Sequence, residues 1–142
     1  MPLIPYLTVK NADAAIAFYK TAFGAEETLR LASRGMVGHA EMKIGDAQFM
    51  LSDEFPEMDI LGPETRGGSP VVMHLYVDDV DAFVARAVAA GAKVLRPVED
   101  QFYGDRGGKL VDPFGHLWWF ATHKEDVSPE EMKRRAAALF GG

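Results

Sequence analysis

The chain has 142 residues, of which 48% are hydrophobic and 25% are charged, a composition typical of one folded globular domain. Its net charge of -6, without a cluster of Lys and Arg, argues against binding to nucleic-acid phosphates. The absence of cysteine excludes disulfides, thiolate nucleophiles and sulfur-ligated zinc, and leaves His, Asp and Glu as the candidate metal ligands.

The distribution of apolar residues predicts neither membrane insertion nor secretion. No run of about eighteen apolar residues occurs in the sequence. The N-terminus lacks a basic segment followed by an apolar stretch, as a secretory signal would require. We therefore expect a cytoplasmic protein that has no membrane partner.

The two halves of the chain share one pattern, which is typical of a repeated folding unit. Tyr6-Leu7-Thr8-Val9 corresponds to His74-Leu75-Tyr76-Val77, and Gly24-Ala25 corresponds to Gly91-Ala92. The offset between these segments is close to half the chain. Each half shows a strand, an amphipathic helix, a strand and a hairpin, so we predict an α+β fold made of two βαβββ modules.

The first module is expected over residues 3–53. A helix follows its opening strand, because Asn11 or Asp13 can cap the helix and Gly24 can end it in a left-handed conformation. The apolar stripe of this helix consists of Ile16, Tyr19 and Phe23. The module closes with a hairpin, since residues 39–44 alternate between polar and apolar side chains and Gly45-Asp46 provides a two-residue turn.

Residues 54–69 connect the two modules. They are rich in turn formers, yet they also carry apolar side chains, namely Phe55, Met58, Ile60 and Leu61. These side chains are expected to be buried away from water. The segment would therefore pack on the core, form a flap over a cavity or contact a partner subunit.

The second module is expected over residues 70–123, with a helix that Asp78 or Asp79 can cap and that Gly91 can end. The apolar stripe of the helix consists of Val80, Phe83, Val84, Ala87 and Val88. The closing hairpin turns at Asp112-Pro113-Phe114-Gly115. Beyond the module, Ser128-Pro129-Glu130-Glu131 is a capping box that predicts a C-terminal helix over residues 129–140.

Together these segments resemble the vicinal oxygen chelate (VOC) superfamily, of the glyoxalase and bleomycin-resistance type. The pieces that carry the resemblance are Tyr6-Leu7-Thr8-Val9, Ala15-Ile16-Ala17-Phe18-Tyr19, Phe23-Gly24 and Asp112-Pro113-Phe114-Gly115-His116-Leu117-Trp118. Gly38-His39-Ala40-Glu41 and Gln101-Phe102-Tyr103-Gly104-Asp105-Arg106 are similar to the PhnB-like branch. The resemblance implies a curved mixed sheet around a shared ligand cavity, and a homodimer.

Enzymes of this superfamily hold a divalent metal with side chains from the first and last strands of each module. The resemblance places the four ligand positions at apolar residues, which are Ile4, Leu51, Val72 and Trp119. It therefore implies a cavity with no metal and no other cofactor. The alternative is a divalent ion such as Zn, Ni or Mn, because a slip of one residue in a strand would reverse its faces.

Strand alternation then selects the residues that face the cavity, since residues two apart on a strand share a face. The expected ligand-binding strand residues are Tyr6, Thr8, Phe49, Leu51, Val72, His74, Tyr76 and Trp119. The aromatic rings among them would offer flat walls to a ring or an acyl chain, although aromatic residues in strands also fill cores.

By the same alternation, Ala40 and Met42 face the cavity, whereas His39 and Glu41 face away from it. His39 and Glu41 would form a metal-binding or acid–base pair only if the opposite faces were exposed.

Arg106 is expected to point its guanidinium into the cavity, where it would bind carboxylate, phosphonate or enolate oxygens. The alternative is a structural salt bridge with Asp105, Asp100 or Glu99.

Two residues of the preceding loop, Gln101 and Tyr103, would add hydrogen bonds at the mouth of the cavity. His74 can act as a base, a ligand or a hydrogen-bonded core residue. The candidates for a catalytic role are therefore His74, Tyr103 and Arg106.

Two functions are compatible with these residues. The first is a protein that binds a small, partly aromatic or anionic molecule in a metal-free cavity. The second is a lyase, isomerase or transferase of the VOC type, which either uses no metal or depends on a divalent one. Whether the chain is an enzyme stays open at this stage.

Overall fold

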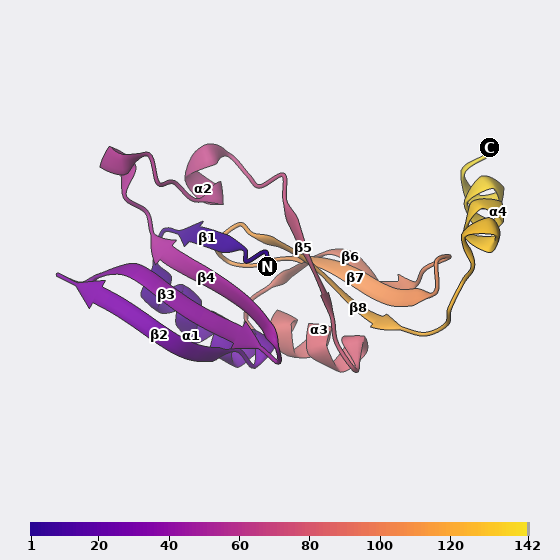
Figure 1. The fold of residues 1–142 in the computed structure, drawn as a ribbon, viewed down its shortest axis with the longest axis horizontal. Helices are drawn as coiled ribbons and strands as arrows, with labels where there is room; N and C mark the ends of the chain where they lie inside the picture. Colours follow the sequence, from indigo (N-terminus) through magenta and orange to yellow (C-terminus); the bar gives the residue numbers. More distant parts are fainter. Residues whose placement is uncertain (142) are drawn as a thin grey trace.

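Each half of the chain folds into a four-stranded sheet with one long helix on one face, in a computed structural model that describes residues 1–141 (Figure 1). The first sheet has the order β1-β4-β3-β2 and comprises β1 (Tyr6–Val9), β2 (Glu26–Ser33), β3 (Met36–Ile44) and β4 (Ala47–Asp53). The second has the order β5-β8-β7-β6 and comprises β5 (Val72–Tyr76), β6 (Lys93–Asp100), β7 (Asp105–Val111) and β8 (Leu117–His123). The predicted succession of a strand, a helix and three strands in each half is confirmed.

The two helices of the modules, α1 (Ala12–Phe23) and α3 (Val80–Ala90), begin and end where their caps predict. The Asn11 side chain accepts a hydrogen bond from the backbone N–H of Ala14, and the Asp79 side chain accepts one from Ala82. Asn11 and Asp79 are therefore the caps among the predicted alternatives. Gly24, with φ of 65°, ends α1 in the left-handed region.

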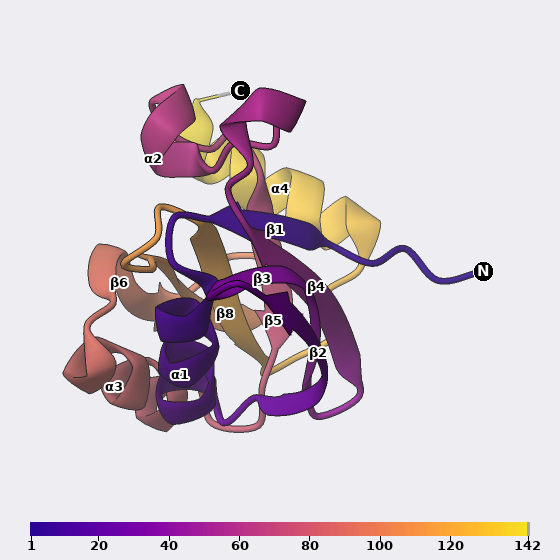
Figure 2. The same ribbon diagram turned by 90° about the vertical axis from the view of Figure 1, so that its left-hand side faces the viewer.

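The core lies where α1 and α3 pack side by side against each other and against the two sheets (Figures 1 and 2). Phe23 of α1 stacks on Phe83 of α3, with ring centroids 5.8 Å apart, and meets Trp118 of β8 at 4.9 Å. Such aromatic contacts stabilise the packing beyond the burial of apolar area. The two modules therefore share one core while each keeps its own hydrogen-bonded sheet.

The turn after β7 joins the two modules through one buried carboxylate. Asp112 is 4% exposed, and it accepts hydrogen bonds from the Tyr19 hydroxyl of α1 at 2.6 Å and from the Trp118 indole at 2.9 Å. It also accepts from the backbone N–H of Phe114 and of His116. Burial, and the negative charge of Asp112, raise the pKa of the Tyr19 hydroxyl well above its ordinary value, so this phenol stays a donor.

The connecting segment packs on the first module beside β1. It contains a short 3-10 helix, η1 (Pro56–Met58), and one helical turn, α2 (Pro63–Arg66), which contacts β1. A side chain at Gly62 would place its Cβ 2.6 Å from the Thr8 carbonyl oxygen, so only glycine allows this approach. The Glu54 carboxylate holds the segment by accepting from the Gly62 N–H and from the Thr65 hydroxyl.

The C-terminal helix α4 (Pro129–Phe140) lies at the far end of the molecule from α1 (Figure 1). Arg135 anchors it by donating to the Phe102 carbonyl at 3.0 Å and to the Glu125 carboxylate at 2.9 Å. No residue of α4 is buried, although Leu139 and Phe140 are large and apolar. Within residues 1–141 no helix combines the length and the apolar character needed to cross a membrane.

We predict that Asp112→Asn lowers the free energy of unfolding by about 2–4 kcal/mol. The new side-chain amide nitrogen is itself a hydrogen-bond donor, and in this buried site it would face the donors that Asp112 now accepts from. Urea denaturation measures the loss. Asp46→Asn, in the exposed turn between β3 and β4, is the matched control and should stay within about 0.5 kcal/mol of the parent protein. Equal losses in the two variants would contradict this role of Asp112.

Candidate functional site

One face of each sheet is covered by α1 or α3, and the chain leaves the opposite face uncovered. In the first sheet, Tyr6 pairs with Met50, and Met50 pairs with Glu41, so these three side chains share the uncovered face. We call this surface the first-sheet face and define it by Tyr6, Thr8, His39, Glu41 and Met50. In the second sheet the corresponding second-sheet face consists of Val72, His74, Tyr76, Lys109 and Trp119.

The second-sheet face carries a row of aromatic side chains. Val72, His74 and Tyr76 are all exposed along β5, and Tyr76 keeps 59% of its surface accessible. The His74 ring lies 5.0 Å from the ring of Tyr76 and 6.4 Å from that of Trp119, measured between centroids. The structure thus brings together four of the residues that the sequence predicted, although their role as ligand contacts stays a prediction.

Trp119 lies directly over the neighbouring strand β7. A Cβ added to Gly107 would stand 2.7 Å from the indole Nε1, so only glycine admits the ring at this position. The indole Nε1 is buried and has no hydrogen-bond partner within residues 1–141. The ring therefore forms the floor of the second-sheet face.

A buried carboxylate fixes the polar groups at one end of this face. Asp105 is 4% exposed and accepts hydrogen bonds from the Tyr76 hydroxyl at 2.8 Å and from Nδ1 of His123 at 2.9 Å. The hydrogen bond to Asp105 raises the pKa of Tyr76, so the phenol stays protonated and offers its oxygen lone pairs to a ligand. Hydrogen bonds to Asp105 and Asp126 likewise raise the pKa of His123.

The loop before β7 lies beside this cluster. Gln101 donates from its side-chain amide to the carbonyls of Glu99 and Gly107, at 3.1 and 3.4 Å. Burial and the nearby charge of Asp105 raise the pKa of Tyr103. Gln101 and Tyr103 are therefore close to the second-sheet face, at the end marked by Asp105.

The prediction that Arg106 points into the cavity is wrong. Arg106 pairs with Thr122 on the face that α3 covers, and its guanidinium donates to Asp81 at 2.8 and 3.1 Å and to Asp100 at 3.2 Å. These two carboxylates raise the pKa of Arg106 further above its ordinary value. The cause is register, because Val111 pairs with Leu117, which puts the even-numbered residues of β7 against α3.

The expected orientation of Leu51 is also wrong, and Phe49, which lies on the same face of β4, borders only the apolar cleft between the two modules. Leu51 pairs with the buried Leu7 and is fully covered, while the Phe49 ring packs 5.3 Å from Tyr19 and 5.8 Å from Trp118 in the core. Because β1 and β4 are parallel with Leu7 opposite Leu51, the odd-numbered residues of β4 face α1.

The same register reverses the expectation for the neighbouring strand β3. Ala40 and Met42 are buried in the core, whereas His39 and Glu41 lie on the uncovered face. The prediction was the reverse, with Ala40 and Met42 facing the cavity and His39 and Glu41 facing away from it.

Sequence reasoning missed the cationic groups of the second-sheet face. Lys109 pairs with Trp119 on one side and with Arg96 of β6 on the other. Lys109 and Arg96 therefore supply the positive charge that Arg106 was expected to bring. Alternation along β7 identifies Lys109 once the register of the final hairpin is known.

The strand positions that carry metal ligands in the superfamily do not present a metal-binding donor set here, and His39 and Glu41 of β3 add only two potential ligands on the first-sheet face. Among the four strands that carry metal ligands in the superfamily, the uncovered faces present Tyr6, Met50, His74 and Trp119. Only the imidazole in this set is a common metal ligand. Across residues 1–141, no group of three or more His, Asp or Glu side chains is arranged to hold a metal ion.

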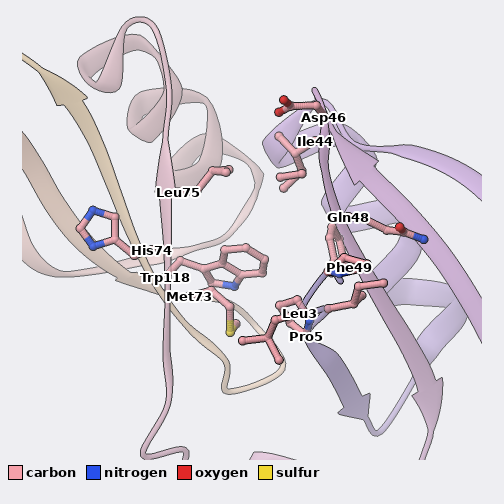
Figure 3. A pocket seen from close by; sticks show the side chains of 13 residues that line it. Leu3, Pro5, Ile44, Asp46, Gln48, Phe49, Met73, His74, Leu75 and Trp118 are labelled. Carbon is pink, nitrogen blue, oxygen red and sulfur yellow. The ribbon is translucent and has the colours of Figure 1, made fainter.

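A separate apolar cleft of about 380 Å³ lies between the two modules (Figure 3). Met73, Leu75 and Trp118 point into it from the second module, and Phe49 faces them from the first (Figure 3). His74 also borders the cleft, but its ring lies on the other side of β5 from the side chain of Leu75 (Figure 3). The cleft and the second-sheet face therefore lie on opposite sides of β5.

Comparison with known proteins supports the assignment made from these elements. The chain is 42% identical to an uncharacterized protein of Mycobacterium bovis over 144 residues, which cover 99% of this chain and 95% of the relative. The crystal structure of a gene product from Arabidopsis thaliana is similar, with a TM-score of 0.67 at 31% identity. The match covers 85% of this chain and 98% of the Arabidopsis chain.

TioX from Micromonospora sp. ML1 is also similar, with a TM-score of 0.69 at 25% identity over 90% of this chain and 100% of the TioX chain. The sequence profile of the Glyoxalase/Bleomycin resistance protein/Dioxygenase superfamily matches residues 4–120. The chain therefore belongs to the Glyoxalase/Bleomycin resistance protein/Dioxygenase superfamily.

Proposed function

We propose that this protein binds a small, partly aromatic and anionic molecule on the second-sheet face, without a metal ion. The observation that carries the proposal is the row of His74, Tyr76 and Trp119, whose rings lie side by side on a face that the chain leaves uncovered. Contiguous exposed aromatic side chains are a common property of ligand-binding surfaces.

The polar groups around this row favour an anionic group on the ligand. Lys109 and Arg96 lie next to Trp119, and the Tyr76 oxygen is held in place by Asp105. A carboxylate or sulfonate would pair with the two cations while an aromatic ring stacks on the indole. Gln101 and Tyr103 would contact the ligand at the end of the second-sheet face that is marked by Asp105.

The alternative is a lyase, isomerase or transferase of the VOC type, possibly dependent on a divalent metal. Its remaining candidate groups are His74 and Tyr103, since ion pairs hold Arg106 away from the second-sheet face. His39 and Glu41 join them, because the reversed register puts this pair on the uncovered face of the first sheet. We place the chain in the PhnB-like branch and in the cytoplasm as part of the same proposal, on the motifs that resemble that branch.

We predict that 1-naphthoate binds the protein saturably and that Trp119→Ala weakens its affinity about tenfold, because the aromatic floor is lost. Tryptophan fluorescence and calorimetry measure the binding. Lys109→Gln should weaken 1-naphthoate but leave the neutral naphthalene-1-methanol unchanged. Met58→Ala, at an exposed apolar side chain of η1, is the control, and a loss of affinity equal to that of Trp119→Ala would contradict the site.

We also propose a homodimer. Large apolar side chains outside the proposed ligand-binding residues are exposed on β2, β3, β6 and α4, among them Leu31, Met36, Val94, Leu95, Leu139 and Phe140. A second copy of the chain could cover these side chains, because exposed apolar patches often mark contacts between proteins.

Light scattering on the purified protein tests this proposal. We expect a molar mass of twice 15.6 kDa, and a shift toward the monomer in Leu31→Lys, which places a charge on the exposed apolar surface of β2. A mass of 15.6 kDa at every concentration would rule the dimer out.

We predict that Zn²⁺, Ni²⁺ and Mn²⁺ give no saturable rise in Tm, because no three His, Asp or Glu side chains within residues 1–141 are grouped so that they could bind one ion together. The titration is run on protein purified without a chelator, followed by elemental analysis. A stoichiometric ion that His74→Ala removes would instead favour the metal-dependent enzyme.

A further inference from the structure

The first-sheet face carries a hydrogen-bonded series of side chains that the proposed function does not use. The Tyr6 hydroxyl lies 2.9 Å from Nδ1 of His39, and Nε2 of His39 lies 2.8 Å from a carboxylate oxygen of Glu41. The rings of Tyr6 and His39 stack with centroids 5.5 Å apart. Three ionisable groups from two strands are thus connected in one line.

The chemistry of the three groups fixes the positions of the protons. An ionised carboxylate only accepts hydrogen bonds, so Nε2 of His39 must carry the hydrogen that is donated to Glu41. A neutral imidazole has one N–H, which leaves Nδ1 of His39 as an acceptor. When His39 is neutral, Tyr6 therefore donates a hydrogen bond to Nδ1 of His39 and presents only oxygen lone pairs to the outside.

The series combines an accessible end with a protected one. Tyr6 is 49% exposed, whereas the side chains of His39 and Glu41 are 26% and 25% exposed. A molecule at the surface would meet the phenol first. The imidazole and the carboxylate stay partly shielded from water, which strengthens the attraction between them once the imidazole is protonated.

The side chains directly opposite the pair on the neighbouring strands are uncharged, whereas Arg66 and His116 border the pocket beside Tyr6. Leu31 and Leu29 of β2 lie opposite His39 and Glu41, and Met50 of β4 lies opposite Glu41 on the other side. Along β3 the next ionisable residue on the same face is Lys43, which is exposed. Glu41 is therefore the charge that acts most directly on His39.

We propose that Tyr6, His39 and Glu41 form an acid–base site that accepts a proton from the hydroxyl of a bound phenol or enol. The ligand's O–H bond breaks and its proton moves to the Tyr6 oxygen, while the proton of Tyr6 moves to Nδ1 of His39. The ligand is left as a phenolate or enolate that accepts a hydrogen bond from Tyr6. The imidazolium of His39 is paired with Glu41, so the total charge is unchanged.

Binding of 4-nitrophenol tests this step, because its neutral and ionised forms absorb at different wavelengths. The protein is mixed with the probe below the pH at which the free probe ionises. We expect the bound probe to be the phenolate, and the bound phenolate fraction to fall about tenfold in Tyr6→Phe and in His39→Gln. Glu41→Gln keeps a hydrogen bond to His39 but removes its charge, and should give an intermediate fraction.

Two controls separate this site from the second-sheet face. Trp119→Ala should leave the phenolate signal of 4-nitrophenol unchanged, while it weakens 1-naphthoate. Lys43→Gln should also leave the signal unchanged, which excludes a general effect of the nearby positive charge. Urea denaturation of each variant verifies that it is folded.

Nitrogen-15 chemical shifts of His39 give a readout that needs no ligand. We expect the neutral ring to carry its hydrogen on Nε2 and to lose this preference in Glu41→Gln. Three results with 4-nitrophenol would each overturn the proposal. They are binding of the neutral probe, the lack of saturable binding, and a phenolate signal that persists in Tyr6→Phe. A neutral His39 with its hydrogen on Nδ1 would do the same.

Discussion

The packing of α1 against α3 is the constraint on which the rest of the structure depends. Each helix covers one face of its own sheet and meets the other helix along a shared aromatic core. The opposite face of each sheet is thereby left to solvent or to a partner. The hydrogen bonds of Asp112 to Tyr19 and Trp118 hold this arrangement, because they join a turn of the second module to the helix of the first.

The order of the elements follows from local sequence, which explains why it could be predicted. Caps such as Asn11 and Asp79, and the glycines that end the helices, act within a few residues and leave a clear pattern. The face of β5 was also predictable. Alternation along one strand, together with its parallel neighbour β8, places His74, Tyr76 and Trp119 together.

The errors of prediction share one physical origin. The face of a residue on β4 or β7 depends on the pairing of that strand with its neighbours, and a shift of one residue exchanges the two faces. Leu51 was placed from the metal positions that the resemblance implied. Arg106 was placed from the prediction that the final hairpin turns at Asp112-Pro113-Phe114-Gly115. In the structure Leu51 opposes Leu7, and Asp112 and His116 close the turn, so both side chains lie on covered faces.

The two uncovered faces therefore differ in chemistry although the modules repeat one pattern. The second-sheet face combines aromatic rings with the cations Lys109 and Arg96, whereas the first-sheet face carries the linked groups of Tyr6, His39 and Glu41. Each sheet keeps its own hydrogen-bonded strands. A duplicated module can in this way present two surfaces of different chemistry.

Gly107 has a consequence for the shape of any molecule that the second sheet accepts. No side chain separates the indole of Trp119 from the backbone of β7, so the ring lies directly against the strand at Gly107. A methyl group at this position would lift the ring and reduce the clearance above it. For the ligand proposed above, the absence of this one carbon atom would therefore leave more room over the ring, enough for a thicker molecule than a side chain at this position would allow.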